Sequence, residues 1–253
     1  MEIAVFLDVD NTLTKDFIQR QYAKVLDCVT EYDRLEAQFQ AKAIDSTEFG
    51  EQIIKLFAAR QFTKLKAEQH FKDVDRQPWT DKLLKLPKVH KYLVSSGPSY
   101  YIDQLAEFYN IEPENICRTV YTFSAETGII EGCAAVSSQN KADFVNTRKD
   151  KYDITIGVGD SELFDGPFLS HCTIPLMTTK NTNCFQASDF QAVILLIQKL
   201  TAALPDEAGH LDPDNWTLPQ MWRHMNLKLF GYVALVFGAG YGFAEFIHRV
   251  FHI

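Results

Sequence analysis

The chain opens with an uninterrupted apolar run, Ile3 to Leu7, that ends in two aspartates. Because no polar residue alternates with the apolar ones, the run is typical of a strand buried on both faces. Side chains alternate in direction along a strand, so a straight strand would present Asp8 and Asp10 on one face. Like charges this close raise each other's pKa unless a cation or donors hold them. The pattern predicts a functional strand end, although a capping turn at Asp10 and Asn11 fits the same residues.

Two later apolar runs also end in small or acidic residues. The run Tyr92–Val94 leads into Ser95 and Ser96, and Ile154–Ile156 leads into a glycine-containing turn with Asp160. Both runs predict strands, and the carboxyl ends of parallel strands are where ligands bind in helix-covered sheets. We therefore expect these polar residues to share one site with the aspartates of the first strand.

The remaining α/β pattern is a doubly wound one. The predicted elements are a helix at 100–109, a strand at 119–123, a small hairpin within 124–136, a helix opened by Lys141, a strand at 173–177 and a helix from 188 to about 204. The expected fold class is α/β, with a parallel sheet covered by helices.

A long stretch between the first two strands lacks strand character. Apolar residues three or four apart predict one amphipathic helix from Ile18 to Val29, and Asp45 precedes a second helical pattern as its N-cap. We expect a helical insertion over residues 16–86, which divides the core into residues 1–15 and 87–204.

Four sequence motifs appear in order: DVDNT from Asp8, the serine of SSG, Lys141, and GDSELFD from Gly159 to Asp165. Together they resemble the haloacid dehalogenase (HAD) superfamily of phosphohydrolases, in its phosphoserine-phosphatase-like branch. The resemblance covers roughly residues 1 to 200. It implies a HAD Rossmann-like core, and it implies that the helical insertion is a C1-type cap that covers the site and selects substrates.

The resemblance assigns the chemistry residue by residue. Asp8 would attack phosphorus and form an aspartyl-phosphate, which divides one difficult step into two. Asp10 would protonate the leaving oxygen and then take a proton from water. Lys141 would neutralise the developing charge, and Ser95 would bind phosphate oxygens. Ser96 competes with Ser95 for the phosphate-binding role, and Ser95 is preferred because it directly follows the apolar run.

The acids also imply a cation. Mg²⁺ suits hard oxygen ligands, and by resemblance its ligands would be an Asp8 oxygen, the backbone carbonyl of Asp10, and Asp160. Asp165 completes the last motif, with Glu162 as the alternative. Asp165 would orient Asp160, a metal-bound water or the motif lysine.

The substrate is less constrained. Phosphoserine phosphatases carry a glutamate nine residues after the nucleophile, and this position is Phe17 here. The departure argues against phosphoserine. With Tyr22 nearby, Phe17 favours an apolar or aromatic leaving group, which makes protein phosphotyrosine a candidate substrate beside a small phosphometabolite.

Composition and charge narrow the partners. The 253 residues carry a formal net charge of −8, which argues against a broad nucleic-acid surface. The five cysteines show no metal-ligand spacing and fit a reducing compartment. Met1 and Glu2 lead straight into the first strand, so no signal peptide is expected.

The C-terminal region changes character. Residues 205–220 are rich in proline and acids and predict a linker, and residues 221–253 form a hydrophobic segment. Its uncharged run, Leu229–Ala244, would be roughly 24 Å long as a helix, short of a bilayer core of about 30 Å. We expect a C-terminal membrane anchor or re-entrant segment that leaves the catalytic domain in the cytosol. Gly238 and Gly242 form a candidate helix-dimer face. A soluble helical hairpin is the alternative.

The predicted function is Mg²⁺-dependent phosphomonoester hydrolysis through Asp8, by an enzyme tethered to a membrane. Two alternatives remain open at this point. One is a membrane-tethered HAD-like module that binds a phosphorylated partner. The other is a phosphotransferase that passes the aspartyl-phosphate to an acceptor other than water.

Overall fold

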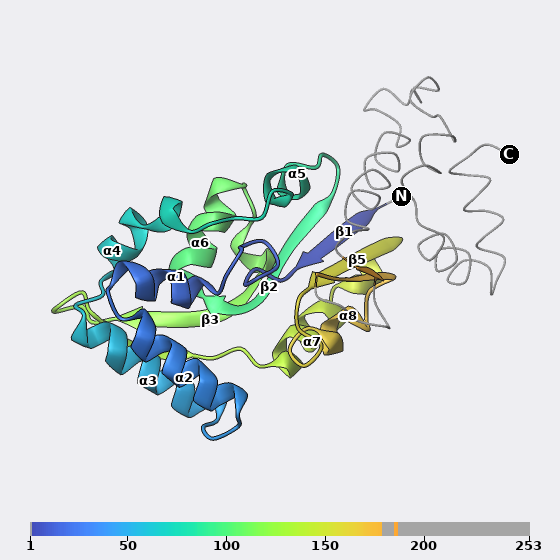
Figure 1. Cartoon of the computed structure of the whole chain (residues 1–253). Coiled ribbons are helices and arrows are strands. Elements are labelled where there is room, and N and C mark those ends of the chain that lie inside the picture. The colour runs from blue at the N-terminus through green and yellow to red at the C-terminus, as the bar shows by residue number, and fades with distance from the viewer. Residues whose placement is uncertain (1, 179–184, 187–253) are drawn as a thin grey trace, which may run out of the picture.

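One sheet lies at the centre of the part of the chain that the structure, a computed structural model, describes: residues 2–178 and 185–186. Its strand order is β4-β3-β2-β1-β5-β6-β7, and every neighbouring pair is parallel except β3 and β4. Figure 1 shows the arrangement. The elements are β1 (Ile3–Leu7), α1 (Ile18–Val25), α2 (Val29–Gln40), α3 (Ser46–Ala59), α4 (Lys64–Gln69), η1 (Phe71–Asp73), α5 (Thr80–Leu84), β2 (His90–Pro98), α6 (Ser99–Phe108), η2 (Pro113–Asn115), β3 (Ile116–Phe123), β4 (Ile130–Ala134), α7 (Ser138–Asn146), η3 (Lys149–Lys151), β5 (Ile154–Gly159), α8 (Gly166–Leu169), β6 (Ile174–Met177) and β7 (Phe185–Gln186). The α/β fold class expected from the sequence is confirmed.

The first strand shows why the sheet is covered on both faces. Ile3, Val5 and Leu7 pack into one hydrophobic cluster with residues of α6 and of the helical insertion. Ala4 and Phe6 pack into a second cluster with residues of α7 and α8. Because successive side chains of a strand point to opposite faces, an all-apolar strand is what a sheet between two helical layers requires.

Strand register brings the predicted site residues to one edge. Leu7 pairs with Leu93 of β2 on one side and with Val158 of β5 on the other. The residues that follow these positions therefore gather at the carboxyl ends of three neighbouring strands. The chain runs outward from β1 to β2 and β3 and then returns to β5 on the other side of β1, and such a reversal of strand order is where α/β sheets bind ligands.

Five helices, α1 to α5, lie between β1 and β2 in the chain. Four of them, α1 to α4, lie in an insertion whose two ends are joined to each other: residues 13–15 run antiparallel to residues 75–77, with a bridge between Thr14 and Arg76. Two backbone hydrogen bonds, of 2.9 and 2.8 Å, complete the pairing. The insertion thus leaves the core and returns to it at one place, directly after the turn that follows β1.

The prediction of a single helix from Ile18 to Val29 is wrong, because the helix ends at Val25 and α2 starts at Val29. Asp27 takes a left-handed conformation with φ of 54°. The amide of Cys28 then donates to the carbonyl of Ala23, and that of Asp27 to Lys24. These two bonds form a Schellman motif, which satisfies the last carbonyls of α1 and turns the chain.

Other boundaries differ in detail. The hairpin expected within 124–136 is formed instead by β3 and β4, so only its second strand lies there. Lys141 is the fourth residue of α7 and does not open it, since Ser137 and Asn140 form a capping box that starts the helix three residues earlier. The N-cap predicted at Asp45 is confirmed, because its side chain accepts from two amides of the first turn.

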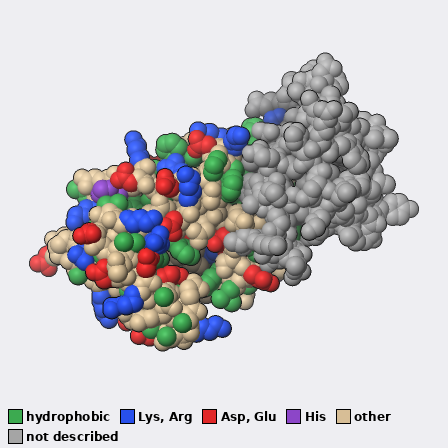
Figure 2. Space-filling view, in the orientation of Figure 1, with side chains coloured by type: hydrophobic (Ala, Val, Ile, Leu, Met, Phe, Trp, Pro, Cys, Tyr) green, Lys and Arg blue, Asp and Glu red, His purple; other side chains and the backbone are tan. Residues whose placement is uncertain are grey.

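Several predictions lie outside the described residues. These are the helix from 188 to about 204, the linker 205–220, and the hydrophobic segment 221–253 with Gly238 and Gly242. Within residues 2–178 and 185–186, no helix combines the length and the apolar character needed to cross a bilayer. On the face shown in Figure 2, basic and acidic side chains of the described part are interspersed.

Candidate active site

The turn after β1 is held by hydrogen bonds to a single backbone carbonyl. The amides of residues 12–14 donate to the carbonyl of Val9 at 2.9 to 3.3 Å, and Asn11 takes a left-handed conformation with φ of 55°. Just before this turn, the amide of Asp8 donates to Val158 of β5 at 2.8 Å and continues the sheet ladder. The turn and this backbone hydrogen bond together fix the position of Asp8 at the sheet edge, independently of the contacts of its side chain.

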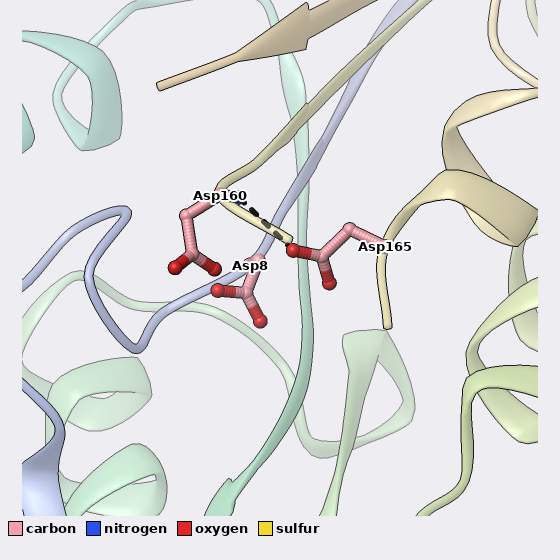
Figure 3. A group of neighbouring side chains, drawn as sticks. All are labelled: Asp8, Asp160 and Asp165. Atoms are coloured by element: carbon pink, nitrogen blue, oxygen red, sulfur yellow. Dashed lines mark hydrogen bonds between the residues drawn. The ribbon is translucent and has the colours of Figure 1, made fainter. Parts of the chain in front are cut away.

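Asp8 lies in a buried ion-pair network. Lys141 Nζ donates to Asp8 Oδ1 at 2.8 Å and to Asp165 Oδ1 at 2.6 Å. The three residues are at most 3 % exposed. Helix α7 supplies the lysine and the segment before α8 supplies Asp165, so three distant parts of the chain meet here (Figure 3 shows the two aspartates).

Asp165 also holds the loop that follows β5. Its Oδ2 accepts from the amides of Asp160 and Ser161, each at 3.0 Å, as the dashed lines of Figure 3 mark in part. A Cβ at Gly159 would lie 2.6 Å from the Cβ of Asp165, so the close approach requires glycine. Of the three roles expected for Asp165, the structure shows contacts with the lysine and with the backbone of Asp160.

The acids form a group that suits a hard cation. Carboxylate oxygens of Asp8, Asp160 and Asp165 lie within 4.8 Å of one another, and Figure 3 shows the three side chains converging. Asp8 Oδ2 is buried without a hydrogen-bond partner in the described part of the chain. Both oxygens of Asp165 already accept hydrogen bonds. An all-oxygen donor set with one orphaned buried oxygen fits Mg²⁺; Asp8 and Asp160 would be its direct ligands and Asp165 a positioning group.

Electrostatics of the site follow from burial. Burial and the neighbouring Asp165 raise the pKa of Asp8 well above its usual range, and they raise the pKa of Asp160 to about 7. Burial opposes the charge of Lys141, but Asp8 and Asp165 outweigh it and raise its pKa. The protein alone thus leaves its acids short of positive charge, which a divalent cation would supply.

Asp10 is held apart from this network. Its Oδ1 accepts from the amide of Ile18, the first residue of α1, at 2.6 Å. Burial raises its pKa to about 6 despite that hydrogen bond. A Cβ at Gly97 would lie 2.5 Å from Asp10 Oδ2 and 3.1 Å from Ser95 Oγ, so Asp10 and Ser95 flank the same glycine.

The remaining predicted residues occupy three different positions. Ser95 is fully buried, and its Oγ accepts from the amide of Gly97 at 3.0 Å. Ser96 Oγ is buried without a partner in the described residues, while its carbonyl accepts from Thr119. Phe17 is half-buried directly before α1. The structure thus brings Ser95 to Asp10, and Phe17 borders the residue whose amide binds Asp10.

Sequence reasoning expected the insertion to cover the site, but it did not name Glu36 or Phe39 among the residues near it. Glu36 of α2 is among the charges that raise the pKa of Asp10. Phe39, one turn further along, stacks on Phe164 of the loop after β5, with ring centroids 6.1 Å apart. The spacing of apolar residues predicts which side of a helix is buried. It does not predict which loop that helix will contact.

The sequence matches no protein-family model and no curated protein. Solved structures are similar in fold. A HAD-family hydrolase from Salmonella enterica serovar Typhi aligns with a TM-score of 0.61 and 15 % identity, over 71 % of this chain and 63 % of the hydrolase. A substrate-bound phosphoserine phosphatase aligns with a TM-score of 0.62 and 12 % identity, over 77 % and 97 %. A phosphoserine phosphatase with an analogue of its phospho-aspartyl intermediate aligns at 0.57 and 12 %, over 70 % and 85 %. The protein therefore has the fold of the haloacid dehalogenase hydrolases, in the form that phosphoserine phosphatases have.

Proposed function

We propose that the protein hydrolyses phosphate monoesters through a covalent intermediate on Asp8. The observation that carries the proposal is the state of the Asp8 carboxylate: one oxygen is held by buried Lys141, and the other is buried with no partner in the described residues. A carboxylate that an ammonium holds in one orientation, yet that is incompletely hydrogen-bonded, is suited to act as a nucleophile.

In the first step, an Asp8 oxygen forms a bond to phosphorus while the bond from phosphorus to the leaving oxygen breaks. Asp10 gives its proton to that oxygen, which leaves as an alcohol. A pKa of about 6 places Asp10 near the range in which a general acid works at neutral pH. The ammonium of Lys141 balances the charge that the phosphoryl group brings to the buried carboxylates.

In the second step, Asp10 takes a proton from water, and the water oxygen attacks phosphorus. The bond between the Asp8 oxygen and phosphorus breaks, which releases inorganic phosphate and restores the carboxylate. Ser95 is fully buried beside Asp10 and can bind a phosphate oxygen in both steps. Mg²⁺ held by Asp8, Asp160 and the Asp10 backbone would screen the repulsion between substrate and carboxylates.

The test compares the full-length wild type with Asp8→Asn, with and without Mg²⁺. The substrates are phosphoserine, a phosphotyrosine peptide, phosphosugars and simple alkyl phosphates. Asp143→Asn, which changes an exposed carboxylate of α7, is the matched control. We expect hydrolysis that requires Mg²⁺ and Asp8, and a phosphorylated Asp8 peptide by mass spectrometry after acid quenching. Full activity of Asp8→Asn would refute the mechanism, and folded protein without activity on any substrate would favour a binding module.

The membrane anchor remains part of this proposal. Its support is the uncharged run Leu229–Ala244 in the sequence. Flotation of the full chain with liposomes, compared with a chain that ends at Leu204, tests it. Equal flotation of both proteins would remove the basis for membrane attachment.

A further inference from the structure

A cavity lies where η1 and the segment after it meet the end of α6. Its volume is about 360 Å³, and it is lined by Phe71, Lys72, Val74, Asp75, Arg76 and Phe108. None of the residues assigned above to phosphate chemistry lines it. Sites for small molecules have volumes of about 300–1,000 Å³, so this cavity is large enough to hold one.

Arg76 is held in the wall of this cavity by aromatic side chains. Its guanidinium carbon lies 4.8 Å from the ring centroid of Phe71 and 5.4 Å from that of Phe108. Its Nε donates to the hydroxyl of Tyr101 at 3.3 Å. A guanidinium has five N–H donors in a planar fork, and this bond uses one of them. The fork is therefore oriented before a ligand arrives, which lowers the entropic cost of binding.

The positive charge of the cavity has no ion-pair partner within the protein. Among the described residues, neither Arg76 nor Lys72 forms an ion pair with a carboxylate. Asp81 of neighbouring α5 pairs with Lys85 instead, at 3.2 Å. Asp75 also lines the cavity, but its single charge leaves the two cations in excess. An anion with one negative charge would balance the cavity.

The other wall of the cavity offers an apolar ring. Phe108 is 56 % exposed, although it ends a helix whose other large apolar side chains are buried. Its ring centroid lies 6.4 Å from that of Phe71, at an interplanar angle of 53°. Aromatic rings stack well on one another, so a ligand with a ring of its own would cover this surface while its charged group reaches Arg76.

We propose that this cavity binds a small aromatic carboxylate. A carboxylate can accept two parallel hydrogen bonds from the fork of Arg76, and the ammonium of Lys72 adds a second attraction. The aromatic part of the ligand lies against Phe108. A neutral aromatic molecule would leave the charge unbalanced, and an aliphatic carboxylate would leave the ring exposed. The inference does not depend on the proposed phosphatase activity, because the two sites share no residue.

The test measures the binding of phenylacetate to the full chain by isothermal titration calorimetry. Acetate lacks the ring and benzyl alcohol lacks the charge, so they serve as the comparison ligands. We expect phenylacetate to bind at one site with a Kd of about 1 mM or tighter. We expect each comparison ligand to bind at least about tenfold more weakly, since each loses either the charge-assisted hydrogen bonds or the ring contact.

Three variants locate the site. Phe108→Ala should weaken the binding of phenylacetate about tenfold, because it removes the ring contact. Arg76→Lys keeps the charge but loses the fork and should also cost about tenfold. Lys72→Met should cost about threefold, since its ammonium is exposed. The Tm of Phe108→Ala and of Lys72→Met should stay close to that of wild type, because both side chains are exposed.

Leu65→Ala and Lys55→Met are the matched controls, because these exposed side chains do not line the cavity. Both should bind phenylacetate as wild type does. The inference would be overturned by any of three results: no saturable binding of phenylacetate, binding that Phe108→Ala leaves unchanged, or equal binding of acetate or benzyl alcohol. None of these results would bear on the phosphatase proposal, which the hydrolysis assay tests separately.

Discussion

Replacing Lys141 with methionine tests the electrostatic design of the site without a substrate. The side chain keeps its length and loses its charge. In the variant, the carboxylates of Asp8, Asp160 and Asp165 would lie together without the Lys141 ammonium. That ammonium now donates to Asp8 and Asp165. We expect Lys141→Met to destabilise the metal-free protein strongly at neutral pH.

The magnitude follows from the geometry. At 2.8 and 2.6 Å, and with an effective dielectric constant of about 20, each contact contributes roughly 6 kcal/mol of attraction. The cost of burying these charges offsets most of it. Removing one partner of a buried ion pair costs about 3–5 kcal/mol because the other charge stays behind. The total free energy of unfolding of a protein is about 5–15 kcal/mol, so the expected loss is a large fraction of it.

Urea unfolding in the presence of a chelator measures the effect at pH 7.5 and at pH 5.5. The loss should be smaller at pH 5.5, because burial already raises the pKa of Asp8 and a proton can then replace the missing charge. Lys64→Met removes an exposed lysine whose partner is 4.0 Å away and serves as the control. A loss below about 1 kcal/mol, or an equal loss at both pH values, would contradict the reasoning.

Three further predictions concern single positions. Gly97→Ala should lower kcat roughly 100-fold, because the new Cβ would displace Asp10. Gly166→Ala is the control and should be active, because its Cβ would meet no atom closer than 3.9 Å. Steady-state kinetics with a Tm measurement checks both variants. Burial raises the pKa of Asp160 to about 7, so the folded protein holds a proton that the unfolded chain releases near pH 4, and metal-free stability falls as pH rises through 7. Urea unfolding should show Asp160→Asn to be more stable than wild type at pH 8 but not at pH 4, and added Mg²⁺ should raise the Tm of wild type alone. Asp45→Ala should cost about 1 kcal/mol of unfolding free energy in the same assay, since its side chain caps α3.

Local sequence patterns predicted the sheet and its acidic edge well. The apolar run of β1 shows burial on both faces by itself. Asp8 and Asp160 directly follow β1 and β5 as expected, whereas Ser95 lies within β2, which extends to Pro98. The break at Asp27 was not predictable from apolar spacing, because Leu26 and Val29 continue the helical period across it. What ends α1 is a pair of backbone bonds and a left-handed residue that is not glycine.

Long-range contacts explain the rest. Sequence motifs indicated that Asp165 orients something, but only the fold shows that its two oxygens divide between Lys141 and the backbone of the β5 loop. Similarly, the sequence predicts a helix that begins at Tyr100. It does not predict that Tyr22 and Tyr121 pack against the Tyr100 ring, or that the Tyr100 hydroxyl has no partner among the described residues.

The paired segments at 13–15 and 75–77 have an evolutionary consequence. Residues opposite each other in an antiparallel bridge are roughly 5 Å apart, so the Thr14–Arg76 bridge makes the intervening sixty or so residues an excursion with adjacent ends. Such an excursion can be lengthened, shortened or exchanged by recombination without moving the strands on either side. Sequence change in this segment can therefore accumulate while the residues at the carboxyl ends of β1, β2 and β5 keep their positions.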